Sequence, residues 1–388
     1  MIKVGYLLNV SNSWLGGLNY MYGLIDALKK SNSSIIEPYI FISKDTPDHV
    51  KLKFSEVGLL VETNFMTRGK LAYYIWKITR RLFKTDLILE FFLKKYNLDL
   101  ISHSDVFGLR KLKSLNWIPD LQHKFLSKMF DLKEIEKRDK IIDILLSKSD
   151  TVLLSSYQAE SDLKQNFNTH NCNLEVLQFI PRQIDYLKST SNESRLAVND
   201  KYNISESYFF FPSQLWQHKN HICLLKALKH LKDTFGAMPL VVFTGHLEDY
   251  RNLDHSKEIL NFIKYYNLNV KLLGVIAYEE LNVLMVNSIA VISPSLFEGW
   301  SSIVEECKSI GKELVLSDIK VHREQNPAKV HFFSPNDYLK LSEIILGLFS
   351  ANLCEYYAED EFNYFYNKNR EIFVSNYIRI INNTLNLR

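Results

Sequence analysis

Short apolar runs alternate with amphipathic segments along the whole chain. This rhythm is typical of repeated βα units around a mainly parallel sheet. In the first half it predicts strands at Ile2–Leu8, Ile36–Ser43, Leu100–His103, Leu115–Ile118, Thr151–Ser155 and Leu174–Phe179. In the second half it predicts strands at Tyr208–Pro212, Leu240–Thr244, Val270–Leu273, Ala290–Ser293 and Glu313–Leu316. We therefore expect an α/β protein with two doubly wound, Rossmann-like domains.

The periodicity is lost between about Arg182 and Ser207, where the segment STSNESRLAVNDKYNIS is rich in Ser and Asn, as exposed connections are. A length of 388 residues also exceeds what one hydrophobic core usually organises. We expect an N-terminal domain over 1–185, a linker over 186–206, a C-terminal domain over 207–352 and a helical tail over 353–388 that could pack back on the N-terminal domain. Two such domains would face a central cleft, lined by the carboxyl ends of their strands.

Composition narrows the class of protein. Hydrophobic residues at 46% and charged residues at 23% describe an ordinary globular chain, and a net charge of +3 argues against nucleic acid as the main partner. The four cysteines are far apart and form no CxxC pair, which predicts free thiols in a reducing compartment and no zinc site. The N-terminus resembles neither a signal peptide nor a membrane span, so a cytoplasmic location is expected.

The stretch PSLFEGWSSIVEE carries the best chemical signal. It lies between a predicted strand and a predicted helix that starts at Ser301 and ends before Gly311. Ser301 and Ser302 can cap this helix, whose positive end would face an anionic group such as a diphosphate. Glu298 lies before the helix and Glu306 within it, so their carboxylates can accept hydrogen bonds from different hydroxyl groups of one elongated ligand.

Two glutamates at this spacing are, without context, usually two solvated side chains. Their context resembles the signature region of retaining family 4 glycosyltransferases, in which a Glu is followed, after seven residues, by a second Glu. The resemblance implies that Glu298 contacts the transferred sugar and Glu306 the ribose. It also implies that the backbone near Ser301 and Ser302 contacts the diphosphate, with Gly299 and Trp300 in the same donor-binding loop.

A second strand, loop and helix unit, FFFPSQLWQHKNHICLLKAL, places Lys219 and His221 at a helix start. The family usually has an Arg here and a Lys five residues later, both pairing with the donor diphosphate. Lys219 matches the Lys, whereas Gln214 stands in place of the Arg and can offer only a hydrogen bond. The alternative for Lys219 is a solvated lysine at a helix end.

Five residues of the N-terminal half are weaker candidates. Gly16 and Gly17 lie just before a predicted helix, where family members use a Gly pair near the donor phosphates, but a plain tight turn explains them nearly as well. The sequence is not the dinucleotide motif GxGxxG. Asp120 and His123 follow a strand end where many relatives have a His-Asp pair. Pro119 occupies the usual place of that His, so His123 is either a substitute or a structural histidine, and His103 is a weaker candidate.

The segment from Gly69 to Tyr96 is basic, amphipathic and aromatic. It contains Tyr73, Tyr74, Trp76, Phe83, Phe91 and Phe92 together with Lys70, Lys77, Arg80, Arg81, Lys84, Lys94 and Lys95. Such a helix can lie on an anionic membrane surface, which would suit a lipid-linked acceptor. The alternative is a helix that packs its aromatic residues into its own domain and leaves its lysines solvated.

The resemblance spans nearly the whole chain and implies the GT-B fold. It implies a retaining transfer from a nucleotide-sugar donor to a glycan or lipid-linked glycan, in surface polysaccharide synthesis. If the basic helix binds lipid, the cytoplasmic protein would lie at the inner face of the cell membrane. No metal and no cofactor are expected, and the sequence has no evident DxD pair. The rival interpretations are a GT-B sugar-nucleotide epimerase or phosphorylase, and a non-catalytic subunit that binds sugar nucleotides.

Overall fold

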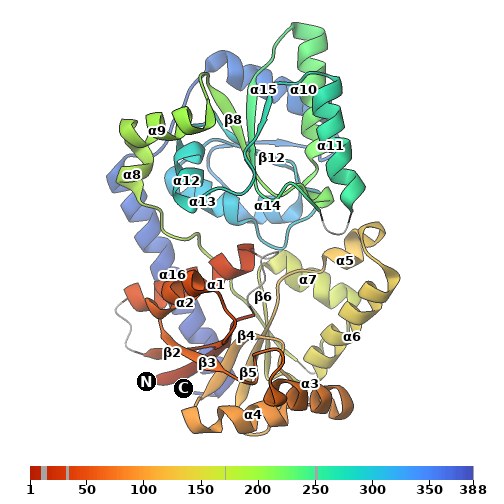
Figure 1. Cartoon of the computed structure of the whole chain (residues 1–388), viewed down its shortest axis with the longest axis vertical. Coiled ribbons are helices and arrows are strands. Elements are labelled where there is room, and N and C mark those ends of the chain that lie inside the picture. The colour runs from red at the N-terminus through yellow and green to blue at the C-terminus, as the bar shows by residue number, and fades with distance from the viewer. Residues whose placement is uncertain (10–14, 32–34, 171, 250–251, 388) are drawn as a thin grey trace. The chain divides into compact units, whose positions relative to one another are not determined.

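The computed structural model describes residues 1–9, 15–31, 35–170, 172–249 and 252–387. The chain divides into two compact units (Figure 1). Unit 1 contains residues 1–121, 132–182 and 368–388, and unit 2 contains residues 122–131 and 183–367. In the described part of the chain, no helix is long and apolar enough to cross a membrane.

Unit 1 is built on a parallel sheet in the order β3-β2-β1-β4-β5-β6-β7. Its strands are β1 (Ile2–Leu7), β2 (Ile36–Ser43), β3 (Leu59–Thr63), β4 (Leu100–Ser104), β5 (Lys113–Ile118), β6 (Thr151–Leu154) and β7 (Asn173–Val176). Its helices are α1 (Leu15–Lys30), α2 (Asp48–Ser55), α3 (Leu71–Phe83), α4 (Leu87–Leu93) with the short η1 (Lys94–Tyr96), α6 (Leu132–Lys148) and α7 (Tyr157–Asn166). Alternate residues of β2 enter different hydrophobic cores. Ile40 and Ile42 lie in one core, and Tyr39 and Phe41 lie in another. The sheet is therefore buried on both faces, as parallel sheets require.

Unit 2 repeats this architecture with the strand order β10-β9-β8-β11-β12-β13. Its strands are β8 (Tyr208–Pro212), β9 (Leu240–Thr244), β10 (Val270–Leu272), β11 (Val291–Ser293), β12 (Leu314–Ser317) and β13 (Val330–Phe333). Its helices are α5 (Gln122–Phe125), η2 (Ser127–Met129), α8 (Tyr186–Thr190), α9 (Asn192–Tyr202), η3 (Gln217–Lys219), α10 (His221–Phe235), α11 (Leu253–Tyr265), α12 (Tyr278–Asn287), α13 (Ser302–Ile310), α14 (Lys320–Gln325) and α15 (Tyr338–Ala351). Phe209 and Phe211 enter the core beside α10 and α15, whereas Tyr208 and Phe210 enter the core beside α12 and α13.

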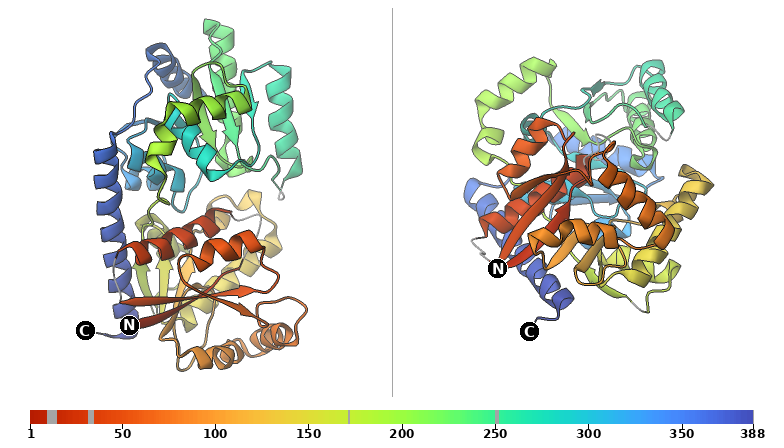
Figure 2. Two further views of the ribbon diagram at one scale, coloured as in Figure 1. Left: turned by 60° about the vertical axis from the view of Figure 1, so that its left-hand side comes forward. Right: turned by 60° about the horizontal axis from the view of Figure 1, so that its bottom comes forward.

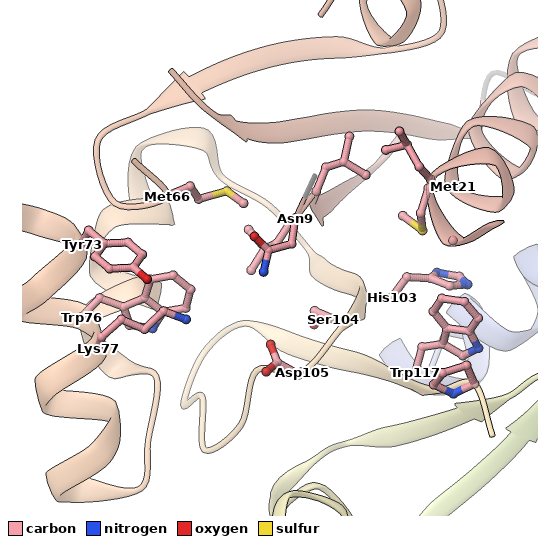
Figure 3. Close-up of a pocket in the computed structure, with 15 residues that line it drawn as sticks. Asn9, Met21, Met66, Tyr73, Trp76, Lys77, His103, Ser104, Asp105 and Trp117 are labelled. Atoms are coloured by element: carbon pink, nitrogen blue, oxygen red, sulfur yellow. The ribbon is translucent and has the colours of Figure 1, made fainter. Parts of the chain in front are cut away.

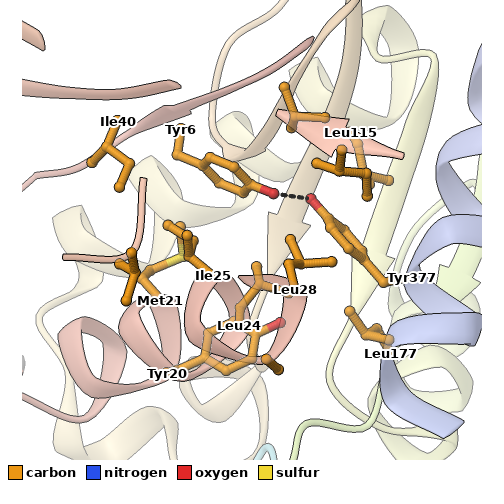
Figure 4. Packing of buried hydrophobic residues seen from close by; sticks show 14 of the residues in the cluster. Tyr6, Tyr20, Met21, Leu24, Ile25, Leu28, Ile40, Leu115, Leu177 and Tyr377 are labelled. Atoms are coloured by element: carbon orange, nitrogen blue, oxygen red, sulfur yellow. Dashed lines mark hydrogen bonds between the residues drawn. The ribbon is translucent and has the colours of Figure 1, made fainter. Parts of the chain in front are cut away.

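The final helix, α16 (Glu359–Leu385), contributes to two cores. Phe362 and Tyr366 are buried in unit 2, and Phe373, Tyr377, Ile380 and Ile381 are buried in unit 1. The Tyr377 hydroxyl is 2.8 Å from that of Tyr6 on β1, inside a cluster of α1 side chains (Figure 4). The polar tips of both tyrosines are thus satisfied within an apolar core.

Every strand predicted from the sequence is present, with bounds shifted by at most a few residues. Two strands were not predicted, β3 and β13, and both lie at a sheet edge. The prediction of an exposed connection over 186–206 was wrong in its structure, because α8 and α9 form there and pack on α12. Their sequence is polar because few of their side chains, such as Val198, reach the core.

Candidate functional site

The first candidate site lies where the strand order of unit 2 reverses, between the adjacent strands β8 and β11. Open α/β sheets bind ligands at the carboxyl ends of strands at such a point. Lys219 follows β8 and Glu298 follows β11, and the Lys219 Nζ lies 2.6 Å from the Glu298 Oε1. The two side chains are 22% and 10% exposed, so this ion pair is shielded and still reachable from solvent.

The loop after β8 is held from several sides. Asn220 adopts the left-handed conformation with φ of 61°, and its amide donates to the backbone oxygens of Pro294 (3.0 Å) and Pro335 (2.8 Å). It therefore ties the loop after β8 to the loops that follow β11 and β13. Gly245, with φ of +112°, allows the close approach of Gln214, since a Cβ there would lie 2.8 Å from the Gln214 backbone nitrogen. Gln214 is partly buried in this loop.

Helix α13 begins directly after the loop that carries Glu298, Gly299 and Trp300. Ser301 occupies the N-cap, but among the described residues its side chain makes no capping hydrogen bond, contrary to our expectation; Ser302 is exposed in the first turn. The first turn is held instead by Gln325, whose Nε2 donates to the Ser301 backbone oxygen (2.8 Å) and to Glu305 Oε1 (2.9 Å). The backbone N–H groups of this turn are thus positioned from α14.

The adjacent glutamates of α13 differ in environment. Glu305 is buried, and burial raises the pKa of its carboxyl although Lys308 and Gln325 oppose the shift. Glu306 is half-buried, and its Oε1 accepts a hydrogen bond from the Tyr278 hydroxyl at 3.1 Å. Of the two side chains, Glu306 is the more exposed, and its contact with a ligand stays a prediction.

Sequence reasoning missed His322, which is fully buried on α14. Its Nδ1 lies 2.8 Å from the Ser317 backbone oxygen, and its Nε2 has no hydrogen-bond partner among the described residues. Burial lowers the pKa of His322, and the nearby Glu298 carboxylate opposes the shift. A neutral imidazole is therefore part of the surroundings of the ion pair. The only sequence signal was its place soon after a predicted strand end.

Unit 1 contains a pocket of about 270 Å³ at its own switch point, between β1 and β4. Figure 3 shows Asn9, Ser104 and Asp105 between two aromatic groups, Trp117 with His103 and Tyr73 with Trp76. The other lining residues are Leu7, Leu8, Gly17, Leu18, Met21, Met66, Lys77 and Pro119. Gly16 and Gly17 lie in the first turn of α1, not before the helix as expected, and residues 10–14 of that motif lie outside the described residues.

His103 lies within a buried chain of hydrogen bonds at this pocket. Its Nε2 lies 2.7 Å from the Tyr20 hydroxyl and its Nδ1 lies 2.8 Å from the Ser102 hydroxyl. The Tyr377 hydroxyl donates to that serine at 2.7 Å. Burial lowers the pKa of His103 to about 3, so its ring is neutral near pH 7. His103 also has a positive φ of 51°, next to an irregularity in the pairing of β4 with β5. A fixed, neutral ring in a strained backbone position is suited to positioning a ligand.

Asp120 and His123 fall in different units. Asp120 follows β5 in unit 1, and His123 lies buried in α5 of unit 2. The ring of Phe125 in α5 stacks on Phe297, with centroids 5.6 Å apart, beside Glu298. The helix that carries His123 is therefore near the loop that carries Glu298.

Solved structures match this chain over nearly its whole length. A glycosyltransferase from Rickettsia africae ESF-5 is 16% identical, with a TM-score of 0.65, over 99% of this chain and 98% of that one. HepE from Anabaena, in complex with UDP and glucose, is 15% identical, with a TM-score of 0.65, over 99% and 96% of the two chains. WaaG, a glycosyltransferase involved in lipopolysaccharide biosynthesis, is 14% identical, with a TM-score of 0.59, over 96% and 95%. The chain has the GT-B fold.

The two Rossmann-like units are the two domains of this GT-B fold, which confirms the predicted fold class. Residues 197–359, from α9 to the start of α16, match the family model described as glycosyl transferases group 1. Among curated proteins, none is significantly similar in sequence. The matched region contains Lys219, Glu298 and Glu306. The family model thus covers most of unit 2, and the solved structures show the fold of the whole chain.

Proposed function

We propose that this chain is a retaining glycosyltransferase that moves a sugar from a nucleotide-sugar donor to a glycan or lipid-linked glycan. The observation that carries the proposal is the Lys219–Glu298 ion pair at the β8/β11 switch point, inside the region that matches the group 1 family model. The Lys219 cation can bind phosphate, and the adjacent Glu298 carboxylate can accept hydrogen bonds from sugar hydroxyls. Both lie close to the start of a helix.

In this proposal the donor displaces the ion pair. The diphosphate binds Lys219 and the N–H groups of the first turn of α13. Glu298, no longer paired with Lys219, accepts hydrogen bonds from the hydroxyls of the sugar. Glu306 binds the ribose. The cation and the helix N-terminus stabilise the charge that develops on the leaving diphosphate. Transfer then needs neither a metal nor a cofactor. An oxygen of the donor phosphate takes the proton of the acceptor, so Glu298 positions the sugar and does not attack it.

The pocket in unit 1 is the proposed acceptor site. The exposed Asp105 carboxylate can accept hydrogen bonds from hydroxyl groups, and the aromatic rings around it offer apolar faces to a sugar ring. WaaG acts in lipopolysaccharide biosynthesis, which supports a role in surface polysaccharide synthesis. The cytoplasmic location stays a prediction.

Two measurements test the proposal. A panel of nucleotide sugars is screened for thermal stabilisation, because a ligand that binds the folded state raises its melting temperature. UDP-glucose is the first donor to try, since HepE was solved with UDP and glucose. With the best donor and a glycan acceptor, a nucleoside diphosphate should be released only when the acceptor is present, and the product should keep the anomeric configuration of the donor.

The same experiment separates the rivals. A sugar-nucleotide epimerase converts the donor into its epimer and needs no acceptor, and a phosphorylase requires inorganic phosphate. A non-catalytic subunit is stabilised by the donor, yet Glu298→Ala leaves glycan assembly unchanged. Activity that EDTA abolishes and Mg²⁺ restores would contradict the metal-free reaction.

A further inference from the structure

Helix α3 of unit 1 presents an apolar stripe to solvent. Leu71, Tyr74, Ile75, Ile78 and Leu82 follow the helical spacing i, i+3, i+4, i+7 and i+11, and they are between 39% and 75% exposed. An apolar stripe of this kind normally faces the core of its own domain. Here it faces outward, so its exposure requires an explanation.

The opposite face of α3 fixes this orientation. Trp76 is buried, and its Nε1 donates to the Asp86 Oδ1 at 2.6 Å. Arg80, on the same face, donates to the Asp105 carboxylate at 2.9 Å. The helix cannot turn its stripe inward without breaking the buried Trp76–Asp86 hydrogen bond and the exposed Arg80–Asp105 ion pair.

The neighbouring α4 extends the apolar surface. Leu89 and Leu93 are buried, whereas Phe91 is 71% exposed, and Phe83 at the end of α3 is 69% exposed. Helices α3 and α4 contact each other and lie side by side in Figure 1. We name the seven exposed apolar side chains of this region the outer apolar surface: Leu71, Tyr74, Ile75, Ile78, Leu82, Phe83 and Phe91.

Positive charge surrounds the outer apolar surface. Residues 69–96 contain seven Lys and Arg against Asp86 and Glu90, a net +5, so the rest of the chain carries a net −2. Asp86 is buried, and Glu90 accepts hydrogen bonds from the backbone nitrogens of residues 110–112. The exposed cations are Lys70, Arg81, Lys84, Lys94 and Lys95, with Arg110 and Lys111 beside α4.

We propose that the outer apolar surface and its cations bind the interface of an anionic lipid bilayer. An amphipathic helix with large apolar residues on one face and basic residues along its borders enters the boundary between headgroups and acyl chains. Long basic side chains place their stems in the apolar layer and their charges at the headgroups. Each Lys or Arg near an anionic surface strengthens binding about fivefold. Charge complementarity favours a bilayer over a second copy of this chain, whose identical surface would repel it.

Co-sedimentation of the full chain with vesicles tests this proposal without using any transfer reaction. We expect binding to vesicles of phosphatidylglycerol and phosphatidylcholine at low salt, weaker binding at 0.5 M salt, and little binding to pure phosphatidylcholine. Arg81→Gln with Lys84→Gln should weaken binding roughly 30-fold. Ile78→Glu with Leu82→Glu should abolish it.

The matched control is Leu52→Glu with Leu132→Glu, two leucines of unit 1 that are 68% and 79% exposed and lie outside this surface. This variant should bind like the wild type. If the control and the Ile78/Leu82 variant lose vesicle binding equally, the proposal is wrong. It is also wrong if the Ile78/Leu82 variant still binds anionic vesicles. Concentration-dependent dimers that the Ile78/Leu82 variant abolishes, without vesicle binding by the wild type, would assign the surface to a second copy. Donor-dependent thermal stabilisation of each variant shows separately whether the donor site is intact.

Discussion

At the residue scale, we expect substitutions of the two members of the Lys219–Glu298 pair to affect the affinity for nucleoside diphosphate differently. Glu298→Gln removes the group that competes with phosphate for Lys219, so we expect nucleoside diphosphate to bind as well or better, while kcat falls about 10²- to 10³-fold. Lys219→Ala should lose both nucleotide affinity and activity. Calorimetry with the nucleoside diphosphate and steady-state kinetics measure the two effects.

The control is Lys229→Ala, because Lys229 forms an ion pair with Asp233 on the surface of the same unit. It should leave both quantities unchanged, since exposed pairs contribute little. If Glu298→Gln and Lys219→Ala weaken nucleotide binding equally, the proposed exchange of partners is wrong.

A buried histidine makes the free energy of unfolding depend on pH. Burial, together with the charges of His255 and Lys219, lowers the pKa of His221 to about 3, against about 6.5 in the unfolded chain. Between these values the unfolded state binds more protons, so stability falls as the pH is lowered from 6.5 towards 3, by about 1.4 kcal/mol per pH unit for this group. His221→Leu should therefore flatten the pH dependence of the unfolding free energy, measured by urea titration between pH 4.5 and 7.

His230, a half-buried histidine of the same helix, provides the comparison. His230→Leu, measured in the same way, shows the effect of removing a histidine of this helix that is not fully buried. Identical slopes in all three proteins would show that His221 is not held neutral.

At the element scale, two helices of unit 2 end at glycines with the same backbone conformation. Gly311 ends α13 with φ of 65° and Gly236 ends α10 with φ of 64°. A Cβ at Gly311 would lie 2.5 Å from the Tyr357 ring, whereas nothing lies within 4 Å of one at Gly236. Gly236→Ala should cost about 1 kcal/mol for the left-handed conformation, and Gly311→Ala about 1–3 kcal/mol more for the clash. Urea unfolding of both variants gives the difference, and equal costs would contradict the close packing of Tyr357.

The helices and strands that could be predicted are those whose burial requires a recognisable pattern of apolar residues in the sequence. β8 is apolar throughout because both of its faces are covered, and its predicted bounds are those observed. The missed strands β3 and β13 are edge strands with few fully buried residues. Likewise, α8 and α9 bury so few side chains that their polar sequence resembled a linker.

The candidate site also contains some residues that could be predicted from the sequence and others that could not. Lys219 and Glu298 follow strand ends, and Glu306 lies within the helix that follows Glu298, which are positions that the local sequence reveals. The roles of Gln325 in holding α13 and of Asn220 in joining three loops depend on residues 24 and 115 positions away, and no local pattern encodes such pairs.

At the scale of the whole molecule, the C-terminal residues complete a core formed by the first residues of the chain. A chain that ends at Asn367 loses Phe373, Tyr377, Ile380 and Ile381 from unit 1. Each large buried side chain contributes about 2–5 kcal/mol, and whole domains are stable by about 5–15 kcal/mol. We expect unit 1 to unfold and become sensitive to protease while unit 2 stays resistant. A chain that ends at Asn386 should behave like the full chain, and a protease-resistant unit 1 in the shorter chain would refute the expectation.

Helix α3 takes part in two surfaces of unit 1. Its outward side chains belong to the outer apolar surface, and Tyr73, Trp76 and Lys77 line the pocket. If both proposals hold, an amphiphilic acceptor can keep its lipid in the bilayer while its polar head enters the pocket. The reaction rate would then follow the mole fraction of acceptor in the membrane, and diluting the acceptor with inert lipid would slow transfer even at constant bulk concentration.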